Sequence, residues 1–202
     1  GEVCIIDPQK REAKKVLKDD DLVTFLPMNE LGLYDRSINA KYTKPLGEVY
    51  KGYTYFADND VLLAKITPSF ENGKLGIANS LMNGIGFGSS EYLVFRCPDY
   101  ILPEYLFYFF HTNSFKIEGS RLMTGAVGHK RLSKDWIYNY NIPIPTLPEQ
   151  QRIVSLLDEA FESIDQAKAN AEKNLENAKE LFESYLQSVF ETKGEGWENK
   201  KL

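Results

Sequence analysis

The feature that most constrains this chain is a long segment without proline or glycine near its C-terminal end. From Glu149 to Thr192 neither residue occurs, and apolar or small residues recur at alternating spacings of four and three. This pattern is typical of a heptad seam on one face of an α-helix. The seam positions, with Asn filling one of them, are Ile153, Leu157, Ala160, Ile164, Ala167, Ala171, Asn174, Ala178, Leu181 and Tyr185.

The length of this helix separates it from the rest of the chain. Thr146 and Glu149 have the spacing of a capping box and Pro148 suits a first helical turn, so we predict a helix over residues 146–192. At 1.5 Å per residue, the part from Ile153 to Phe190 would be about 57 Å long. A domain of the preceding residues would have a diameter of only roughly 30 to 40 Å. We therefore expect the helix to project beyond that domain.

The seam needs a partner. No second segment of comparable length and period occurs in the sequence, so we expect pairing with another polypeptide or with a missing part of this one. The alanines of the seam favour close approach of two helix backbones, and Asn174 would penalise wrong registers. The alternative, in which the helix packs on its own domain, stays open.

Residues 1–145 predict a mixed domain of short strands and helices, which with the long helix gives an α+β fold class. Pro103 suits the start of a buried helix through Phe110, and Ser133 is a plausible cap for a turn through Ile137. Residues 115–123 predict another short helix, and residues 193–202 form a separate tail. The expected strands, rich in β-branched and aromatic residues, are Val3–Ile6, Leu22–Leu26, Val61–Ala64, Ile77–Ala78 and Tyr92–Phe95.

The charge distribution neither requires nor excludes nucleic acid. The net charge is −5, of which residues 1–150 carry −1 (17 Lys and Arg against 18 Asp and Glu) and residues 151–202 carry −4 (7 against 11). Any positive surface must therefore come from local clustering. The longest run of large apolar residues, 105–110, is far short of the roughly 20 that cross a bilayer, so no membrane contact is expected. Cys4 and Cys97 form neither a metal motif nor a disulfide framework. We therefore expect a location in the reducing cytoplasm.

The sequence lacks the parts of a recognisable catalytic site. His111 and His129 are its only histidines, and His111 suits a core or helix-end position better than a metal site. Gly84, Gly86 and Gly88 lack the lysine of a phosphate-binding loop, so a turn or bulge is expected there. We therefore expect no cofactor and no catalytic residue.

Two segments combine basic, hydroxyl and glycine residues, as DNA-contacting loops do. The first covers residues 65–74 and the second residues 121–131. Cations suit phosphates, whereas short polar side chains on a supported loop suit base edges. The candidates for phosphate contacts are Lys65, Lys74, Arg121, Lys130 and Arg131, and those for base contacts are Ser69, Asn72 and His129. Each segment taken alone could equally be an ordinary solvated loop.

The junction between domain and helix carries a family resemblance. Residues 141–154, NIPIPTLPEQQRIV, followed by the long helix, resemble the end of a target-recognition domain in the specificity subunit of type I restriction-modification enzymes. Residues 59–65 and 125–132 resemble the Gly-Asp-Val-Leu stretch and the glycine-containing loop of that family. Residues 197–202 followed by residues 1–3 would read through the motif with which each half of such a subunit opens. The chain thus resembles one repeat unit, either a half-length subunit or a piece of a full one.

The resemblance implies a non-catalytic reader of double-stranded DNA. Its recognition domain would bind one half of a bipartite target, and its helix would dock methyltransferase subunits and, through them, the restriction subunit. A homodimer, or pairing with a second half-subunit, would supply the other half-site. Two alternatives remain: a coiled-coil homodimeric interaction protein that does not bind DNA, and the recognition fragment of a fused methyltransferase.

Overall fold

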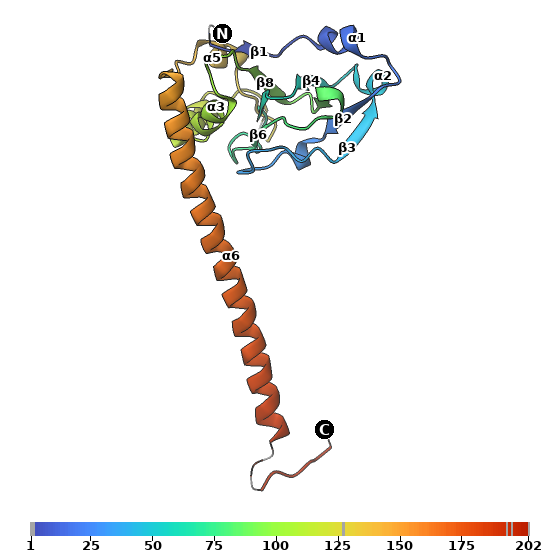
Figure 1. The fold of residues 1–202 in the computed structure, drawn as a ribbon. Helices are drawn as coiled ribbons and strands as arrows, with labels where there is room; N and C mark the ends of the chain where they lie inside the picture. Colours follow the sequence, from blue (N-terminus) through green and yellow to red (C-terminus); the bar gives the residue numbers. More distant parts are fainter. Residues whose placement is uncertain (1–2, 127, 193, 195, 202) are drawn as a thin grey trace. The chain divides into compact units, whose positions relative to one another are not determined.

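The computed structural model describes residues 3–126, 128–192, 194 and 196–201 (Figure 1). The chain divides into two compact units, residues 1–154 and residues 155–202. Gly1, Glu2 and Leu202, on which the tail-to-head reading of the opening motif depends, lie outside the described residues. Among the described helices, none combines the length and the apolar content that a membrane span requires.

The first unit contains two four-stranded sheets. One sheet is antiparallel throughout, with the order β1 (Ile5–Ile6), β8 (Tyr92–Arg96), β5 (Val61–Ala64), β6 (Leu75–Ile77). The other has the order β3 (Tyr42–Pro45), β2 (Leu22–Leu26), β7 (Ile85–Gly88), β4 (Thr54–Ala57), and β2 and β7 run parallel. The helices are α1 (Ala13–Val16), α2 (Leu46–Val49), α3 (Pro103–Phe110), α4 (Asn113–Arg121), α5 (Lys134–Asn139) and α6 (Leu147–Glu191). Short 3-10 turns cover Lys10–Glu12, Met28–Glu30 and Met82–Gly84.

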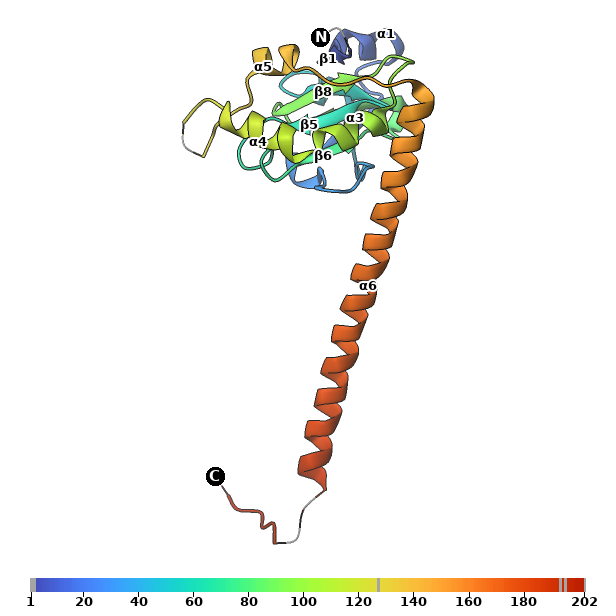
Figure 2. The ribbon, with the colours of Figure 1, turned by 90° about the vertical axis from the view of Figure 1, so that its left-hand side faces the viewer.

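The strand β5 is buried on both faces, which explains its unbroken apolar sequence. Val61 and Leu63 point into a core shared with α3 and α4, whereas Leu62 and Ala64 point into a second core that includes Phe56 of the other sheet. Figure 2 shows α3 and α4 crossing the face of β5 and β6. The buried helix predicted after Pro103 is therefore confirmed, and it covers the sheet that leads into the first candidate loop.

The predicted strands Leu22–Leu26 and Val61–Ala64 are found as expected and the other three with shifted bounds, whereas the strands Tyr42–Pro45, Thr54–Ala57 and Ile85–Gly88 were missed. The N-terminal strand covers only Ile5–Ile6, and Leu75–Ile77 replaces the predicted pair at 77–78. Gly84 adopts a positive φ of 68° in a turn, as expected, but Gly86 and Gly88 lie in the inner strand β7. A Cβ on Gly86 would come 2.1 Å from the ring of Phe56. Glycine is needed there for close packing and not for a bulge, so this part of the prediction was wrong.

The long helix is confirmed, as α6 runs from Leu147 to Glu191. Its first two turns belong to the first unit, where Gln150 and Val154 are buried. The Gln150 side chain donates to the carbonyls of Tyr100 (3.0 Å) and Pro145 (2.9 Å) and accepts from the Leu102 backbone N–H (2.9 Å). These bonds give a physical reason for a glutamine in the junction motif.

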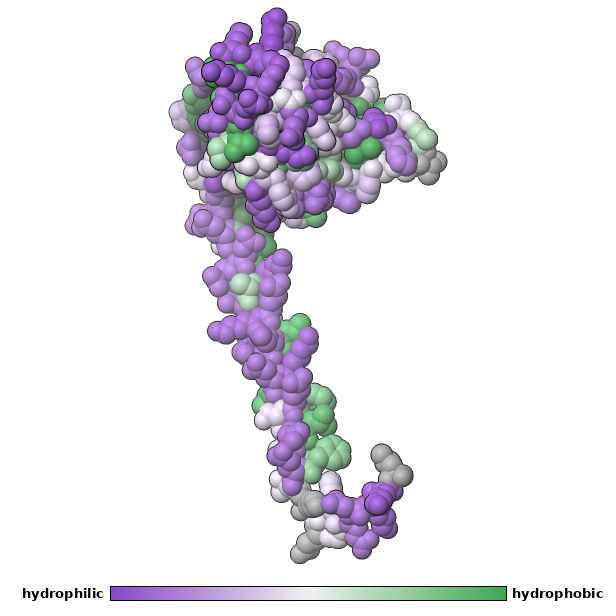
Figure 3. Space-filling view, turned by 90° about the vertical axis from the view of Figure 1, so that its right-hand side faces the viewer, coloured by the Kyte–Doolittle hydropathy of each residue, from purple (hydrophilic) through white to green (hydrophobic). Residues whose placement is uncertain are grey.

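The second unit is, by itself, the rest of α6 and the residues after it. Large apolar side chains are exposed along it, and Figure 3 shows them gathered on the C-terminal half of the helix. Of the predicted seam, Ile153 and Leu157 are partly buried, and the exposed positions are Ala160, Ile164, Ala167, Ala171, Asn174, Ala178, Leu181 and Tyr185. Exposed apolar residues outside that list include Leu156, Leu175, Phe182, Leu186, Val189 and Phe190.

Candidate nucleic-acid interface

The two candidate loops, which are distant in the sequence, lie side by side. The Thr67 N–H donates to the Lys130 carbonyl at 3.0 Å, and the Leu132 N–H donates to the Lys65 carbonyl at 2.8 Å. Between these bonds, Ile66 and Arg131 pair as an antiparallel bridge. The two loops therefore meet where residues 65–67 pair with residues 130–132, and main-chain hydrogen bonds set the geometry of this joint.

The first loop is a tight turn anchored by a buried aromatic ring. The Phe70 side chain is buried against Phe115 of α4, with ring centroids 6.0 Å apart. The Lys74 N–H donates to the Ser69 carbonyl and the Asn72 N–H to the Pro68 carbonyl, which closes the turn. Ser69 is half-buried and Asn72 is exposed. The anchored ring leaves Asn72 on an ordered backbone that faces solvent.

The two lysines of the first loop bind backbone carbonyls. The Lys65 ammonium donates to the carbonyl of Ser90 at 2.8 Å, and burial lowers the pKa of Lys65. The Lys74 ammonium donates to the carbonyl of Met28 at 2.9 Å. Both side chains thus hold the loop to neighbouring segments, a role that the sequence could not reveal because these carbonyls lie 25 and 46 positions away.

The second loop closes as a short hairpin. Thr124 and Arg131 exchange backbone hydrogen bonds of 3.0 and 2.8 Å, and the His129 N–H donates to the Ala126 carbonyl. Gly125 and Gly128 have φ values of +126° and +81°, a region that favours glycine. His129, Lys130 and Arg131 are exposed. Val127 lies outside the described residues, so the hairpin is defined by its two arms.

A cluster of opposite charges lies where the loops meet. The Arg131 guanidinium binds the Glu91 carboxylate at 2.6 Å, and this pair lowers the pKa of Glu91. The Lys134 ammonium binds Asp7 at 2.5 Å, and this contact raises the pKa of Lys134. Glu91 was not among the residues that the sequence suggested, because nothing in the pattern links the turn before β8 to the second loop.

Helix α4 adds further polar side chains beside the first loop. An open groove of about 370 Å³ is lined by Glu71, Asn113, Lys116, Ile117, Ser120 and Arg121. Arg121 therefore lines the same groove as Glu71 of the first loop. Lys116 was missed by sequence reasoning, although Asn113, Lys116 and Ser120 have the i, i+3 and i+7 spacing of one helix face. The Lys116 side chain runs past Gly73, since its ammonium lies 4.0 Å from the position of a Cβ there.

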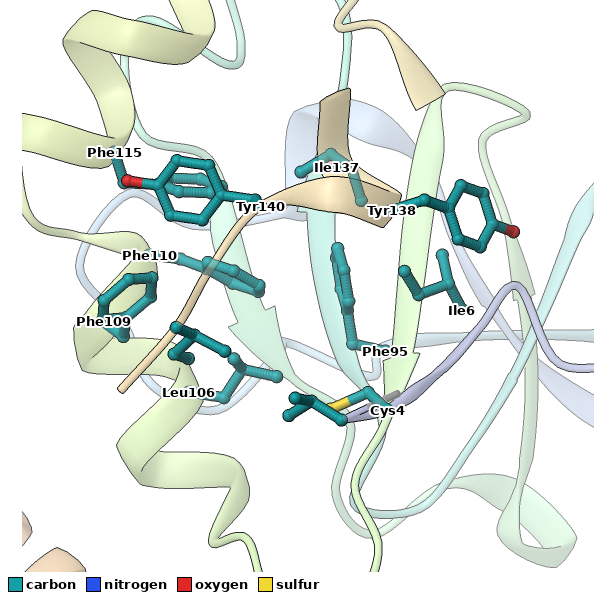
Figure 4. A pocket seen from close by; sticks show the side chains of 12 residues that line it. Cys4, Ile6, Phe95, Leu106, Phe109, Phe110, Phe115, Ile137, Tyr138 and Tyr140 are labelled. Carbon is teal, nitrogen blue, oxygen red and sulfur yellow. The ribbon is translucent and has the colours of Figure 1, made fainter. Parts of the chain in front are cut away.

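An aromatic core supports the elements that flank the second loop. Phe115 of α4 packs against Trp136 of α5 and against Tyr140, with centroids 5.2 and 5.1 Å apart. Figure 4 shows a small apolar pocket in this core, of about 70 Å³, which Phe95, Phe110 and Leu106 also line. Its volume suits a packing gap. The predicted cap is also found, since the Trp136 N–H donates to Ser133 Oγ at 3.4 Å.

The described residues offer no metal site. Among them, no group of three or more His, Cys, Asp or Glu side chains comes together to hold a metal ion. His111 ends α3, with its ring nitrogens 3.1 Å from the Phe107 carbonyl and 2.7 Å from the Leu33 carbonyl. It is the helix-end residue that the sequence indicated.

The family described as Type I restriction modification DNA specificity domain matches residues 1–177. The chain belongs to this family. It is 36% identical over 172 residues to the Type I restriction enzyme EcoAI specificity subunit of Escherichia coli, and 33% identical over 190 residues to the EcoEI specificity subunit. These matches cover 85% and 94% of this chain. The resemblance to specificity subunits of type I restriction-modification enzymes is thereby confirmed.

Two solved structures share the fold of this chain. A structure described as the HsdS subunit from Thermoanaerobacter tengcongensis matches with a TM-score of 0.71 at 16% identity, over 98% of this chain and 50% of that one. A chain from a study of complex assembly and conformational transition in the type I R-M system matches with a TM-score of 0.67 at 20% identity, over 94% of this chain and 44% of that one. The chain spans 29% and 31% of the curated relatives it matches. The α+β class with one long helix is confirmed.

Proposed function

We propose that this chain is a non-catalytic reader that binds one half of a bipartite duplex DNA target through the surface formed by residues 65–74 and 121–131. The observation that carries the proposal is the main-chain pairing of Thr67 with Lys130 and of Lys65 with Leu132, which joins the two loops. A surface held by backbone bonds keeps its shape while its side chains vary. Membership of a DNA specificity family makes duplex DNA the expected ligand.

The side chains of this surface divide by what they contact. We assign phosphate binding to the cations Lys130, Arg121 and Lys116. Lys65 and Lys74 are not assigned this role, because backbone carbonyls hold their ammonium groups. Asn72, Ser69 and His129 are candidates for base edges. Lys65 and Lys74 would shape the first loop, so their removal should disturb binding through loop geometry.

Salt-dependent binding tests this assignment. Each lost phosphate contact lowers the slope of log K against log salt by about 0.9. Lys130→Ala and Lys116→Ala should each have this effect, equally on all duplexes, whereas Asn72→Ala or Ser69→Ala should change which half-site is preferred. Lys173→Ala, which removes the same charge from α6, is the matched control. An unchanged slope in both the Lys130→Ala and the Lys116→Ala variant would place the DNA surface elsewhere.

We further propose that α6 pairs with a second chain, as a homodimer or with another half-subunit, and docks methyltransferase subunits and through them the restriction subunit. The apolar stripe along α6 supports this pairing. Beyond Ala171, the register of the stripe differs from that of the predicted seam. Ile153, Leu157, Ala160, Ile164, Ala167 and Ala171 repeat, 18 residues later, as Ala171, Leu175, Ala178, Phe182, Tyr185 and Val189. Eighteen residues are five turns at 3.6 residues per turn, so the stripe stays on one face of a straight helix.

The pairing has its own test. Replacing Leu157 and Ile164 with Asp should give monomers by light scattering, because charges would be buried at the interface. Phe182→Asp should do the same, and Leu181→Asp should not, since Leu181 lies beside the stripe. A monomeric wild-type chain at tens of micromolar would overturn homodimer formation.

The distance between the two recognition domains of a pair sets the spacing of the two half-sites in the DNA target. An antiparallel pair along about 57 Å would separate two recognition domains by roughly 17 base pairs at about 3.4 Å per base pair. A homodimer should then prefer two inverted half-sites around an unread gap.

Such a subunit would act in the cytoplasm and would have no cofactor of its own. Incubation of the chain with DNA and labelled methyl donor should therefore leave the DNA unlabelled. Dimers that do not bind duplex DNA would instead support the alternative of a coiled-coil interaction protein.

A further inference from the structure

The Arg131 guanidinium is held along one edge by a carboxylate. Its Nε donates to Glu91 Oε2 at 2.9 Å and lies 3.1 Å from Oε1, and its Nη2 donates to Oε1 at 2.6 Å. The Nη1 group donates to the His129 carbonyl at 3.4 Å. Glu91 therefore occupies the side of the guanidinium formed by Nε and Nη2, and it fixes the plane of the group.

The remaining edge of the guanidinium points outward with a defined geometry. A guanidinium has five N–H donors in a planar fork. Glu91 takes the Nε–H and one N–H of Nη2, and the His129 carbonyl takes one N–H of Nη1, so the outer edge keeps one N–H of Nη1 and one N–H of Nη2. These two donors match the O6 and N7 acceptors of guanine in the major groove. Half of the Arg131 side chain, 49%, is exposed, so a base edge can reach it.

Glu91 is itself a rigid support. It lies on the turn between β7 and β8, where the Tyr92 N–H donates to the Ser89 carbonyl and the Glu91 N–H to Ser89 Oγ. The Lys65 N–H donates to the Glu91 carbonyl at 2.9 Å. The Glu91 side chain is only 21% exposed. Because both partners are ordered before any ligand arrives, little rotamer freedom is left to lose on binding.

The charge of the pair separates a base contact from a phosphate contact. Arg131 and Glu91 together carry no net charge, so the pair attracts a phosphate weakly. A guanine edge is neutral and needs oriented donors. We propose that Arg131 reads a guanine in the half-site and that Glu91 is the positioning residue that aims it. This assignment rests on the proposed function, and it replaces the phosphate role that the sequence suggested for Arg131.

Selection from duplexes with a randomised stretch tests the proposal on the full chain. Wild type should enrich a half-site that contains guanine, and Arg131→Ala should lose the preference at one guanine position, by roughly 5- to 150-fold, while other positions persist. Arg131→Lys should retain part of this preference. Lys130→Ala is the control that should weaken binding without changing the enriched sequence.

Two variants separate base reading from a structural ion pair. Glu91→Gln should strengthen binding to all duplexes by adding a net positive charge, yet it should weaken the guanine preference because the fork is no longer held. The double variant Arg131→Ala with Glu91→Ala keeps the net charge, so it should lose the guanine preference with an unchanged salt slope. A slope lowered by about 0.9 in the double variant would instead indicate a phosphate contact.

The outcomes distinguish this inference from the function on which it rests. If wild type enriches a sequence and Arg131→Ala and the double variant enrich the same one, the inference is overturned alone. If wild type binds duplex DNA with no preferred sequence, or does not bind it, the proposed function is overturned and the inference with it. Should Arg131→Ala fail to fold, Arg131→Lys and Glu91→Gln decide, and an unaltered guanine preference in both refutes the role.

Discussion

Replacing Gln150 should cost the first unit about 3 kcal/mol of its free energy of unfolding. The side chain is fully buried at the start of α6 and makes three hydrogen bonds, to the carbonyls of Tyr100 and Pro145 and from the Leu102 N–H. A buried hydrogen bond contributes about 1 kcal/mol net, and partners left without water cost more. Three such bonds therefore set the estimate for Gln150→Ala, and the lost volume adds to it.

The structure offers matched variants for this prediction. Gln151→Ala removes the same residue type from the next position, where the side chain is exposed, and should change stability by less than about 0.5 kcal/mol. Gln150→Met keeps most of the volume and removes the hydrogen bonds, so it isolates their contribution. Gln150→Glu keeps an acceptor for the Leu102 N–H but places a carboxylate against two carbonyls, and it should be no better tolerated than Met.

Urea unfolding followed by tryptophan fluorescence measures these differences. Trp136 lies in the first unit against Phe115, and a Trp197→Phe background makes it the single reporter. With an m-value of about 1 to 3 kcal/mol/M, the Gln150→Ala midpoint should fall by about 1 to 3 M. Equal midpoints for Gln150→Ala and Gln151→Ala would refute the reasoning, because the burial and bonding of Gln150 would then contribute nothing measurable.

Other variants probe the core and the charged cluster. Phe115→Ala should destabilise the first unit by about 3 to 5 kcal/mol in the same assay, as the ring is buried between Phe110 and Trp136. Gly86→Ala should cost about 1 to 3 kcal/mol, because its Cβ would meet the Phe56 ring, whereas Gly88→Ala meets the Leu26 carbonyl and should be at least as harmful. Arg131 lowers the pKa of Glu91, so this pair stabilises the fold above the ordinary Glu pKa of 4.5, and the stabilisation is lost as the pH falls below that value. Glu91→Gln should therefore lose less stability at acid pH than the wild type does. Identical profiles of stability against pH for wild type and variant would contradict the pairing.

Elements with strong periodicity could be predicted, and elements decided by tertiary packing could not. Val61–Ala64 was identifiable because a short apolar run bounded by turn residues suits a strand buried on both faces. The strand Ile85–Gly88 was not, because glycines usually mark turns. Only the Phe56 ring, which comes from a different strand, explains why Gly86 must lack a side chain.

The candidate surface shows the same division. The composition of residues 65–74 and 121–131 indicated two loops of interest, but their contact depends on hydrogen bonds between positions more than 60 residues apart. The sequence also did not show which cations are available to a ligand. Lys65 and Lys74 bind carbonyls of other segments, while Glu91 and Lys116 enter the surface from elements that carry no motif.

The division between backbone and side-chain contacts explains how such a surface could change its target while keeping its fold. Thr67, Lys130, Leu132 and Lys65 are joined through main-chain atoms, which every residue except proline supplies. Substitutions at exposed positions such as Asn72 and His129 therefore leave the joint intact. The anchors beneath, Phe70 and Phe115, are buried and carry no information about DNA. On this reasoning, exchanging Asn72, His129 and Arg131 together should alter the preferred half-site with little loss of stability, whereas a single change at Phe70 should unfold the surface for every sequence.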